Sequence, residues 1–218
     1  MSTRLAVFDC DGTLVDGQAE VCLAMERAFA ATGHPAPGRQ AVRRAIGLSL
    51  PNAVRGLLPD ADEAHRMQVV QAYKNAFRAA REEGALAEPL FDGIEELLRA
   101  LHADGWKLAV ATGKSSRGLR HCLAQHGIAD LFASTHTADD HPSKPHPAML
   151  EAALAETGAA PGDAMMIGDT TYDMDMAVAA GVCAIGVGWG YHAPDELRAS
   201  GAQAVAQDVA ALGALLHG

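Results

Sequence analysis

Positively charged residues are scarce in this chain, and their scarcity excludes two classes of partner. The 218 residues include 17 Lys and Arg against 27 Asp and Glu, for a net charge of −10. Surfaces that bind nucleic acids or anionic membranes carry clustered Lys and Arg. We therefore expect no nucleic-acid partner and no membrane partner. An anionic substrate would need local positive charge from a metal ion, a few basic side chains or helix N-termini.

Cysteine and long hydrophobic runs are also scarce. The thiols are scattered, with no CxxC or Cys/His metal-binding spacing, which favours buried free cysteines in a reducing, cytoplasmic setting. The apolar run at 5–8 is too short for a secretory signal, and the stretch 176–189 is too short to span a bilayer. The four thiols are those of Cys10, Cys22, Cys122 and Cys183.

Hydrophobic residues make up 49% of the chain, which is ample for an α/β core. Residues 4–8 form an apolar run typical of a buried strand, and helical periodicity without strand signals follows up to about residue 84. Strands and helices then alternate, which predicts a doubly wound parallel sheet with helices on both faces. We expect the core to comprise residues 1–14 and 86–218, and residues 15–85 to form a separate helical domain.

Polar residues follow several of the predicted strands. In an open parallel sheet, ligands bind beyond the carboxyl ends of the strands, so these residues should meet at one edge. Carboxylates suit a hard cation such as Mg²⁺, whereas a hydroxyl and an ammonium group suit a phosphate. The residues expected at this edge are Asp9, Asp11, Thr112, Lys144, Asp169 and Asp173.

Each of these segments alone has an ordinary structural explanation. Residues 9–13 could be an acidic turn or part of a calcium loop. The second reading is disfavoured, because a loop of the EF-hand type would need more oxygen ligands and would lie between helices. Thr112 alone is typical of a helix start, and Lys144 alone of a solvated surface. Asp169 and Asp173 are four residues apart on one predicted helix face, where they would repel each other without a cation.

Together and in this order, the segments resemble the four motifs of the haloacid dehalogenase-like hydrolase superfamily. The resemblance covers essentially the whole chain, and the helical segment after the first motif is similar to the cap of the subfamily that contains phosphoglycolate phosphatase. It implies a Rossmann-like core with an inserted helical cap domain. The matching segments are 8–16 (FDCDGTLVD), 111–114 (ATGK), 143–145 (SKP) and 168–173 (GDTTYD).

The resemblance also implies a reaction. Asp9 is the nucleophile that forms an aspartyl phosphate, and Asp11 protonates the leaving oxygen and later activates water. An acid at position 11 argues for phosphate chemistry, because a halide leaves without a proton. Mg²⁺ is bound by Asp9, the backbone carbonyl of Asp11 and Asp169, with water ligands held by Asp173.

Substrate binding is implied for a second group of residues. Lys144 neutralises charge between the nucleophile and the phosphoryl oxygens, while Thr112, the Gly113 N–H and Gly12 lie around the phosphate. Arg43 and Arg44 in the helical segment are further candidates for binding a substrate carboxylate or second phosphate. Position 113 departs from close relatives of phosphoglycolate phosphatase, which often have Asn there.

The sequence leaves the substrate open. A small phosphorylated metabolite is expected, and pyrophosphate, a sugar phosphate or a nucleotide monophosphate would fit the same chemistry. A phosphomutase is disfavoured because no suitable His and Lys pair lies between residues 16 and 33. A phospho-accepting or binding module on the same fold is the non-enzymatic alternative. Both a monomer and a homodimer are compatible with the sequence.

Overall fold

A six-stranded parallel sheet forms the centre of the computed structural model, which describes residues 3–217. The strand order is β3-β2-β1-β4-β5-β6, and β1 pairs in parallel with both β2 and β4. All four residues of β1 are buried, as expected of a central parallel strand. The strands are β1 (Leu5–Phe8), β2 (Lys107–Thr112), β3 (Phe132–Thr137), β4 (Ala164–Gly168), β5 (Cys183–Val187) and β6 (Ala204–Ala206).

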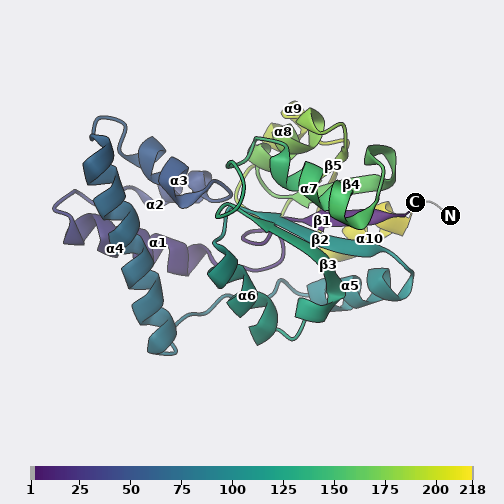
Figure 1. The fold of residues 1–218 in the computed structure, drawn as a ribbon, viewed down its shortest axis with the longest axis horizontal. Helices are drawn as coiled ribbons and strands as arrows, with labels where there is room; N and C mark the ends of the chain where they lie inside the picture. The colour runs from purple at the N-terminus through teal and green to yellow at the C-terminus, as the bar shows by residue number, and fades with distance from the viewer. Residues whose placement is uncertain (1–2, 218) are drawn as a thin grey trace.

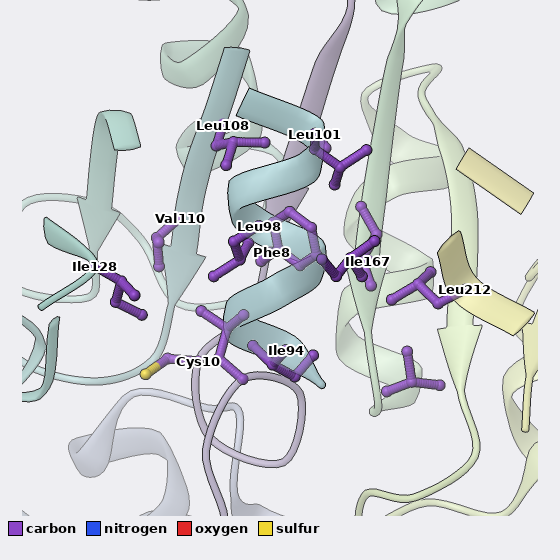
Figure 2. Packing of buried hydrophobic residues seen from close by; sticks show 14 of the residues in the cluster. Phe8, Cys10, Ile94, Leu98, Leu101, Leu108, Val110, Ile128, Ile167 and Leu212 are labelled. Carbon is purple, nitrogen blue, oxygen red and sulfur yellow. The ribbon is translucent and has the colours of Figure 1, made fainter. Parts of the chain in front are cut away.

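Helices cover both faces of this sheet, which confirms the predicted fold class. Alternate residues of β1 point to opposite faces, so Phe8 joins one hydrophobic cluster and Val7 the other. In Figure 2, Phe8 packs with Leu98 of the covering helix and Ile167 of β4. The first face is covered by α5 (Ile94–Ala103), α6 (Ser116–Gln125) and α10 (Val209–His217), and the second by α7 (Ala148–Thr157), α8 (Thr171–Ala179) and α9 (Pro194–Ala199).

Four helices between β1 and α5 make a separate unit, which we call the helical insert. They share their own hydrophobic cluster, which includes Met25, Phe29 and Val69. Figure 1 shows the insert on the side of the sheet where the strands end, away from the N-terminus. The insert consists of α1 (Gln18–Ala31), α2 (Arg39–Ala45), α3 (Leu50–Leu57) and α4 (Glu63–Glu82).

The carboxyl ends of the strands lie at the edge of the sheet that faces the insert. β1 runs directly into Asp9, β2 ends at Thr112, and β4 leads into Asp169. Because these strands are parallel neighbours in register, the three polar residues arrive at one edge. No helix within residues 3–217 combines the length and the apolar character needed to cross a membrane.

Truncation of Leu98 should destabilise the core. Leu98 is fully buried between the sheet and α5, so Leu98→Ala should lower the free energy of unfolding by about 2–5 kcal/mol through lost burial and a residual cavity. Leu23, on the surface of α1 and 36% exposed, is the matched control, for which Leu→Ala should cost less than about 1 kcal/mol. Denaturant unfolding of the two variants measures both values, and equal losses would contradict the assigned core.

Candidate functional site

Three aspartates converge at the ends of β1 and β4. Carboxylate oxygens of Asp9, Asp169 and Asp173 lie within 4.8 Å of one another, and all three side chains are fully buried. Buried carboxylates this close repel one another unless a cation lies between them. The cluster therefore has the donor chemistry of a site for a hard divalent cation.

Local hydrogen bonds hold Asp169 and Asp173 in place. The Thr13 hydroxyl donates to Asp169 Oδ1 and the backbone N–H of Tyr191 donates to Oδ2, each at 2.9 Å. Asp173 Oδ2 accepts from the Thr170 N–H at 3.0 Å and from the Thr170 hydroxyl at 2.7 Å. The first of these bonds is one half of a capping box at the start of α8. Asp173 is thus oriented by the turn that begins α8, whereas Asp169 is oriented by residues from two other loops.

Two glycines allow the chain to pass close to Asp169. Gly12 has a φ of +88°, and a Cβ at Gly12 or at Gly190 would collide with the Asp169 carboxylate. Only a residue without a side chain fits in either place. Gly12 was expected among the substrate-binding residues, and the structure shows that it also makes room for this carboxylate.

Within residues 3–217, Lys144 supplies the one buried ammonium group in contact with this cluster. Its Nζ lies 3.0 Å from Asp9 Oδ1 and 2.6 Å from Asp173 Oδ1, and its side chain is fully buried. Burial alone would lower the pKa of Lys144, but the charges of Asp173 and Asp9 raise it above its ordinary value. Lys144 therefore stays protonated and can neutralise part of the negative charge.

Burial disfavours the ionised forms of Asp9 and Asp169. Burial, together with the charges of Asp173 and Asp11, raises the pKa of Asp9 to about 7 even though Lys144 opposes the change. Burial and the charge of Asp9 raise the pKa of Asp169 as well. Asp9 Oδ2 is buried and has no hydrogen-bond partner. A divalent cation at the cluster would offset this excess charge and give Oδ2 a partner.

Asp11 belongs to a second charged group beside the first. Its Oδ1 accepts from Lys114 Nζ at 2.8 Å, and the same Nζ lies 2.7 Å from Oε1 of the buried Glu88. We identified Lys114 in the sequence only as part of a motif, and the role of Glu88 was missed. A lone acid before a proline, far from the motifs in sequence, carries no pattern that would have pointed to it.

A cavity of about 500 Å³ lies between the helical insert and this edge of the sheet. Asp11, Thr112 and Gly113 contribute to its core side. Thr112 is buried at the end of β2, where its Oγ1 accepts from the Lys114 N–H at 3.2 Å. The cavity thus opens onto the predicted acid and the predicted phosphate-binding residues.

The backbone of the insert explains the glycine at position 113. A Cβ on Gly113 would lie 2.5 Å from the Leu48 carbonyl oxygen and 2.6 Å from that of Gly47. Any larger residue, including the Asn expected from the resemblance, would push this loop away. The missing side chain therefore serves the close approach of the insert to the core.

Neither Arg43 nor Arg44 lines this cavity, contrary to the expectation that they face the site. The Arg44 guanidinium instead pairs with Glu196 of α9 at 2.8 Å. The Arg44 carbonyl also accepts a hydrogen bond from the Tyr172 hydroxyl at 3.1 Å. Arg44 thus holds the insert to the core through its side chain, which pairs with α9, and through its carbonyl, which contacts Tyr172 of α8.

Comparisons with known proteins agree with this geometry. A family model described as haloacid dehalogenase-like hydrolase matches residues 3–181. The protein named "Probable phosphatase IndB" of Dickeya dadantii is 37% identical over 92% of this chain and 88% of its own length. A phosphoglycolate phosphatase of Vibrio vulnificus is 30% identical over 96% of this chain and 94% of its own. The crystal structure of a predicted phosphatase from Clostridium acetobutylicum superposes with a TM-score of 0.89 at 24% identity, covering 100% of this chain and 99% of the other.

Metal binding should stabilise the protein more at neutral than at acidic pH. The folded-state pKa of Asp9, about 7, exceeds its ordinary value of 3.8, so the metal-free folded protein holds an extra proton between these values. The contribution of Asp9 to stability is therefore present below pH 4 and lost as the pH rises towards 7. Mg²⁺ at 100-fold its Kd should restore about 2.7 kcal/mol at pH 7.5, or roughly 5–10 °C in Tm. At pH 5 the Tm shift caused by Mg²⁺ should be smaller, and Asp9→Asn should remove the difference between the two pH values. An equal Tm shift at both pH values in the wild type would contradict this prediction.

Enlarging Gly113 should displace the insert. Gly113→Ala places a methyl group against the Gly47 and Leu48 carbonyls, and overpacking of this kind costs about 1–3 kcal/mol. We expect faster proteolysis of the insert and a lower Tm. Gly162→Ala is the control, because nothing lies within 4 Å of a Cβ there. Unchanged stability and proteolysis in Gly113→Ala would show that the loop at Gly47 and Leu48 can adopt another conformation without loss of stability.

Proposed function

We propose that this chain, which belongs to the haloacid dehalogenase-like hydrolase family and is a phosphatase, hydrolyses a small phosphomonoester with Mg²⁺ through an aspartyl phosphate on Asp9. One observation carries the proposal: the Asp9 carboxylate is buried beside Lys144, with Oδ2 lacking any hydrogen-bond partner. A nucleophile needs free lone pairs and a fixed direction of attack. Asp9 has both.

The orientation of Asp9 comes from its other oxygen. Oδ1 accepts from the Cys10 N–H at 2.6 Å and contacts Lys144 Nζ at 3.0 Å. In the first step, an Asp9 oxygen bonds to phosphorus as the ester P–O bond breaks, and the leaving oxygen takes a proton from Asp11. In the second step, water attacks the phosphorus and gives a proton to Asp11, and the P–O bond to Asp9 breaks to release phosphate.

Asp11 is suited to this exchange of protons by its position. It lies two residues after the nucleophile, lines the cavity and is 8% exposed. The contact with Lys114 Nζ at 2.8 Å fixes the direction of its carboxyl group. We propose that Lys114 and Glu88 position Asp11 and do not themselves touch the phosphate.

Residues of the core are proposed to stabilise the transferred phosphoryl group. Thr112, the Gly113 N–H and Lys144 are proposed to bind its oxygens, with Gly12 beside them, and phosphoryl transfer depends mainly on such positioning and charge stabilisation. Asp9, Asp169 and the Asp11 carbonyl would hold Mg²⁺, and Asp173 would hold its water ligands. The bound ion would supply further positive charge to the phosphoryl oxygens.

The helical insert is proposed to act as a cap, with residues 15–85 as its extent. Contacts between insert and core support this role: the Ser49 N–H donates to Ser143 Oγ at 2.8 Å, beside Lys144, and Arg44 pairs with Glu196. Because these contacts are polar and few, they can break and reform during each turnover. Closure over the cavity would exclude bulk water while the aspartyl phosphate forms.

Replacement of the nucleophile should abolish turnover. Asp9→Asn should lower kcat for p-nitrophenyl phosphate by on the order of 10⁴-fold or more, because a carboxamide is a poor nucleophile and a poor metal ligand. EDTA should have a comparable effect on the wild type. Acid-quenched wild-type enzyme should carry one phosphoryl group on the peptide containing Asp9, as measured by mass spectrometry.

Asp92→Asn is the matched control, because Asp92 is exposed on the core surface and should leave kcat unaltered. Turnover that survives Asp9→Asn would refute the nucleophile. A phosphopeptide that forms without any release of phosphate would point to the phospho-accepting module instead.

A further inference from the structure

The cavity gathers positive charge in a chain that is otherwise acidic. Lys74, Arg78 and Arg81 of α4 line it from the insert, and Arg117 of α6 lines it from the core. None of the four forms an ion pair with any residue between 3 and 217. They stay unpaired although the whole chain has 27 acidic residues and only 17 Lys and Arg. Unpaired cations around a cavity favour an anionic occupant.

The arrangement on α4 strengthens this argument. Lys74, Arg78 and Arg81 are spaced four and three residues apart, so they share one face of the helix, where like charges destabilise it. Arg78 donates only a 3.3 Å hydrogen bond to Asn75. Arg81 Nε is buried and has no acceptor. A buried guanidinium nitrogen without a partner is costly, and an anionic ligand group would satisfy it.

Apolar side chains also line the cavity. They include Met25 of α1, Val42 of α2 and Phe77 of α4, all of which belong to the insert. A volume of about 500 Å³ falls in the range of pockets that hold ligands larger than a two-carbon acid, which is roughly 300–1,000 Å³. The cavity therefore fits a leaving group with an apolar body and a charged far end.

We propose that Arg78 and Arg81, supported by Lys74 and Arg117, bind a second anionic group on the substrate. The substrate class is a phosphomonoester whose alcohol has an apolar body of about ring size and carries a carboxylate or a second phosphate. This inference rests on the proposed function, because it assumes that the first phosphate lies at Thr112 and Asp9. It replaces Arg43 and Arg44 as the ligands of that second anion.

Matched substrates test the proposal. Phenyl phosphate and 4-carboxyphenyl phosphate differ only in a carboxylate, and fructose 6-phosphate and fructose 1,6-bisphosphate differ only in a phosphate. For the wild type we expect kcat/KM to be at least about 10-fold higher for the more anionic member of one pair or both, which also tells carboxylate from phosphate. We further expect 2-phosphoglycolate to be a poorer substrate than the better ring-sized compound.

Charge removal should abolish this preference. Arg81→Gln and Arg78→Gln should lower the ratio of kcat/KM within the preferred pair by about 10-fold, mainly through KM, and Arg81→Lys should recover part of it. Arg55→Gln is the matched control: Arg55 is an exposed arginine of the insert outside the cavity, and its loss should leave the ratio unchanged. Circular dichroism establishes that each variant is folded.

The outcomes separate the two hypotheses. Hydrolysis of phenyl phosphate and fructose 6-phosphate with no preference for either anionic partner would overturn the second-anion site and leave the phosphatase mechanism intact. A preference that is equally strong in Arg78→Gln, Arg81→Gln and wild type would overturn the assignment to α4. Absence of Mg²⁺-dependent hydrolysis for every compound would overturn the proposed function itself.

Discussion

The burial of three carboxylates around one lysine is the constraint on which this structure depends. Asp9, Asp169 and Asp173 are fully buried, and Lys144 alone contacts two of them with a positive charge. Burying ionised groups is costly unless each is paired and hydrogen-bonded. The fold meets that cost with a helix capping box at Asp173 and with two donors to Asp169, but it leaves Asp9 Oδ2 without a partner. The same burial gives the three carboxylates the donor chemistry of a site for a hard divalent cation.

The helical insert stands in a different relation to the chemistry. Its own hydrophobic cluster makes it a distinct unit, and its contacts with the core include polar ones at Arg44 and Ser49 and the close approach at Gly113. The core thus holds the candidate site residues at the ends of strands, while much of the cavity wall comes from the helices of the insert. Such a division allows one phosphoryl-transfer site to serve many leaving groups.

The candidate site residues whose location could be predicted were those at the ends of strands. Asp9, Thr112 and Asp169 each come after a run of buried apolar residues, and a parallel sheet brings such positions to one edge. Glu88 and the pairing of Lys114 with Asp11 could not be predicted, since the partners are separated by 26 and 103 residues and follow no local pattern. Arg43 and Arg44 were assigned to the site from their charge and approximate location, but the rotation of α2 about its axis directs Arg44 to Glu196.

The sequence by itself determined the class of fold, the order of the strands and helices along the chain and the residue types at the strand ends. Local periodicity and residue type suffice for these, because they depend on neighbours a few positions away. Only the tertiary structure decided which cations line the cavity, which arginine is taken up by an ion pair, and why position 113 is glycine. These depend on the approach of the insert to the core, where a Cβ on Gly113 would lie only 2.5 Å from the Leu48 carbonyl oxygen.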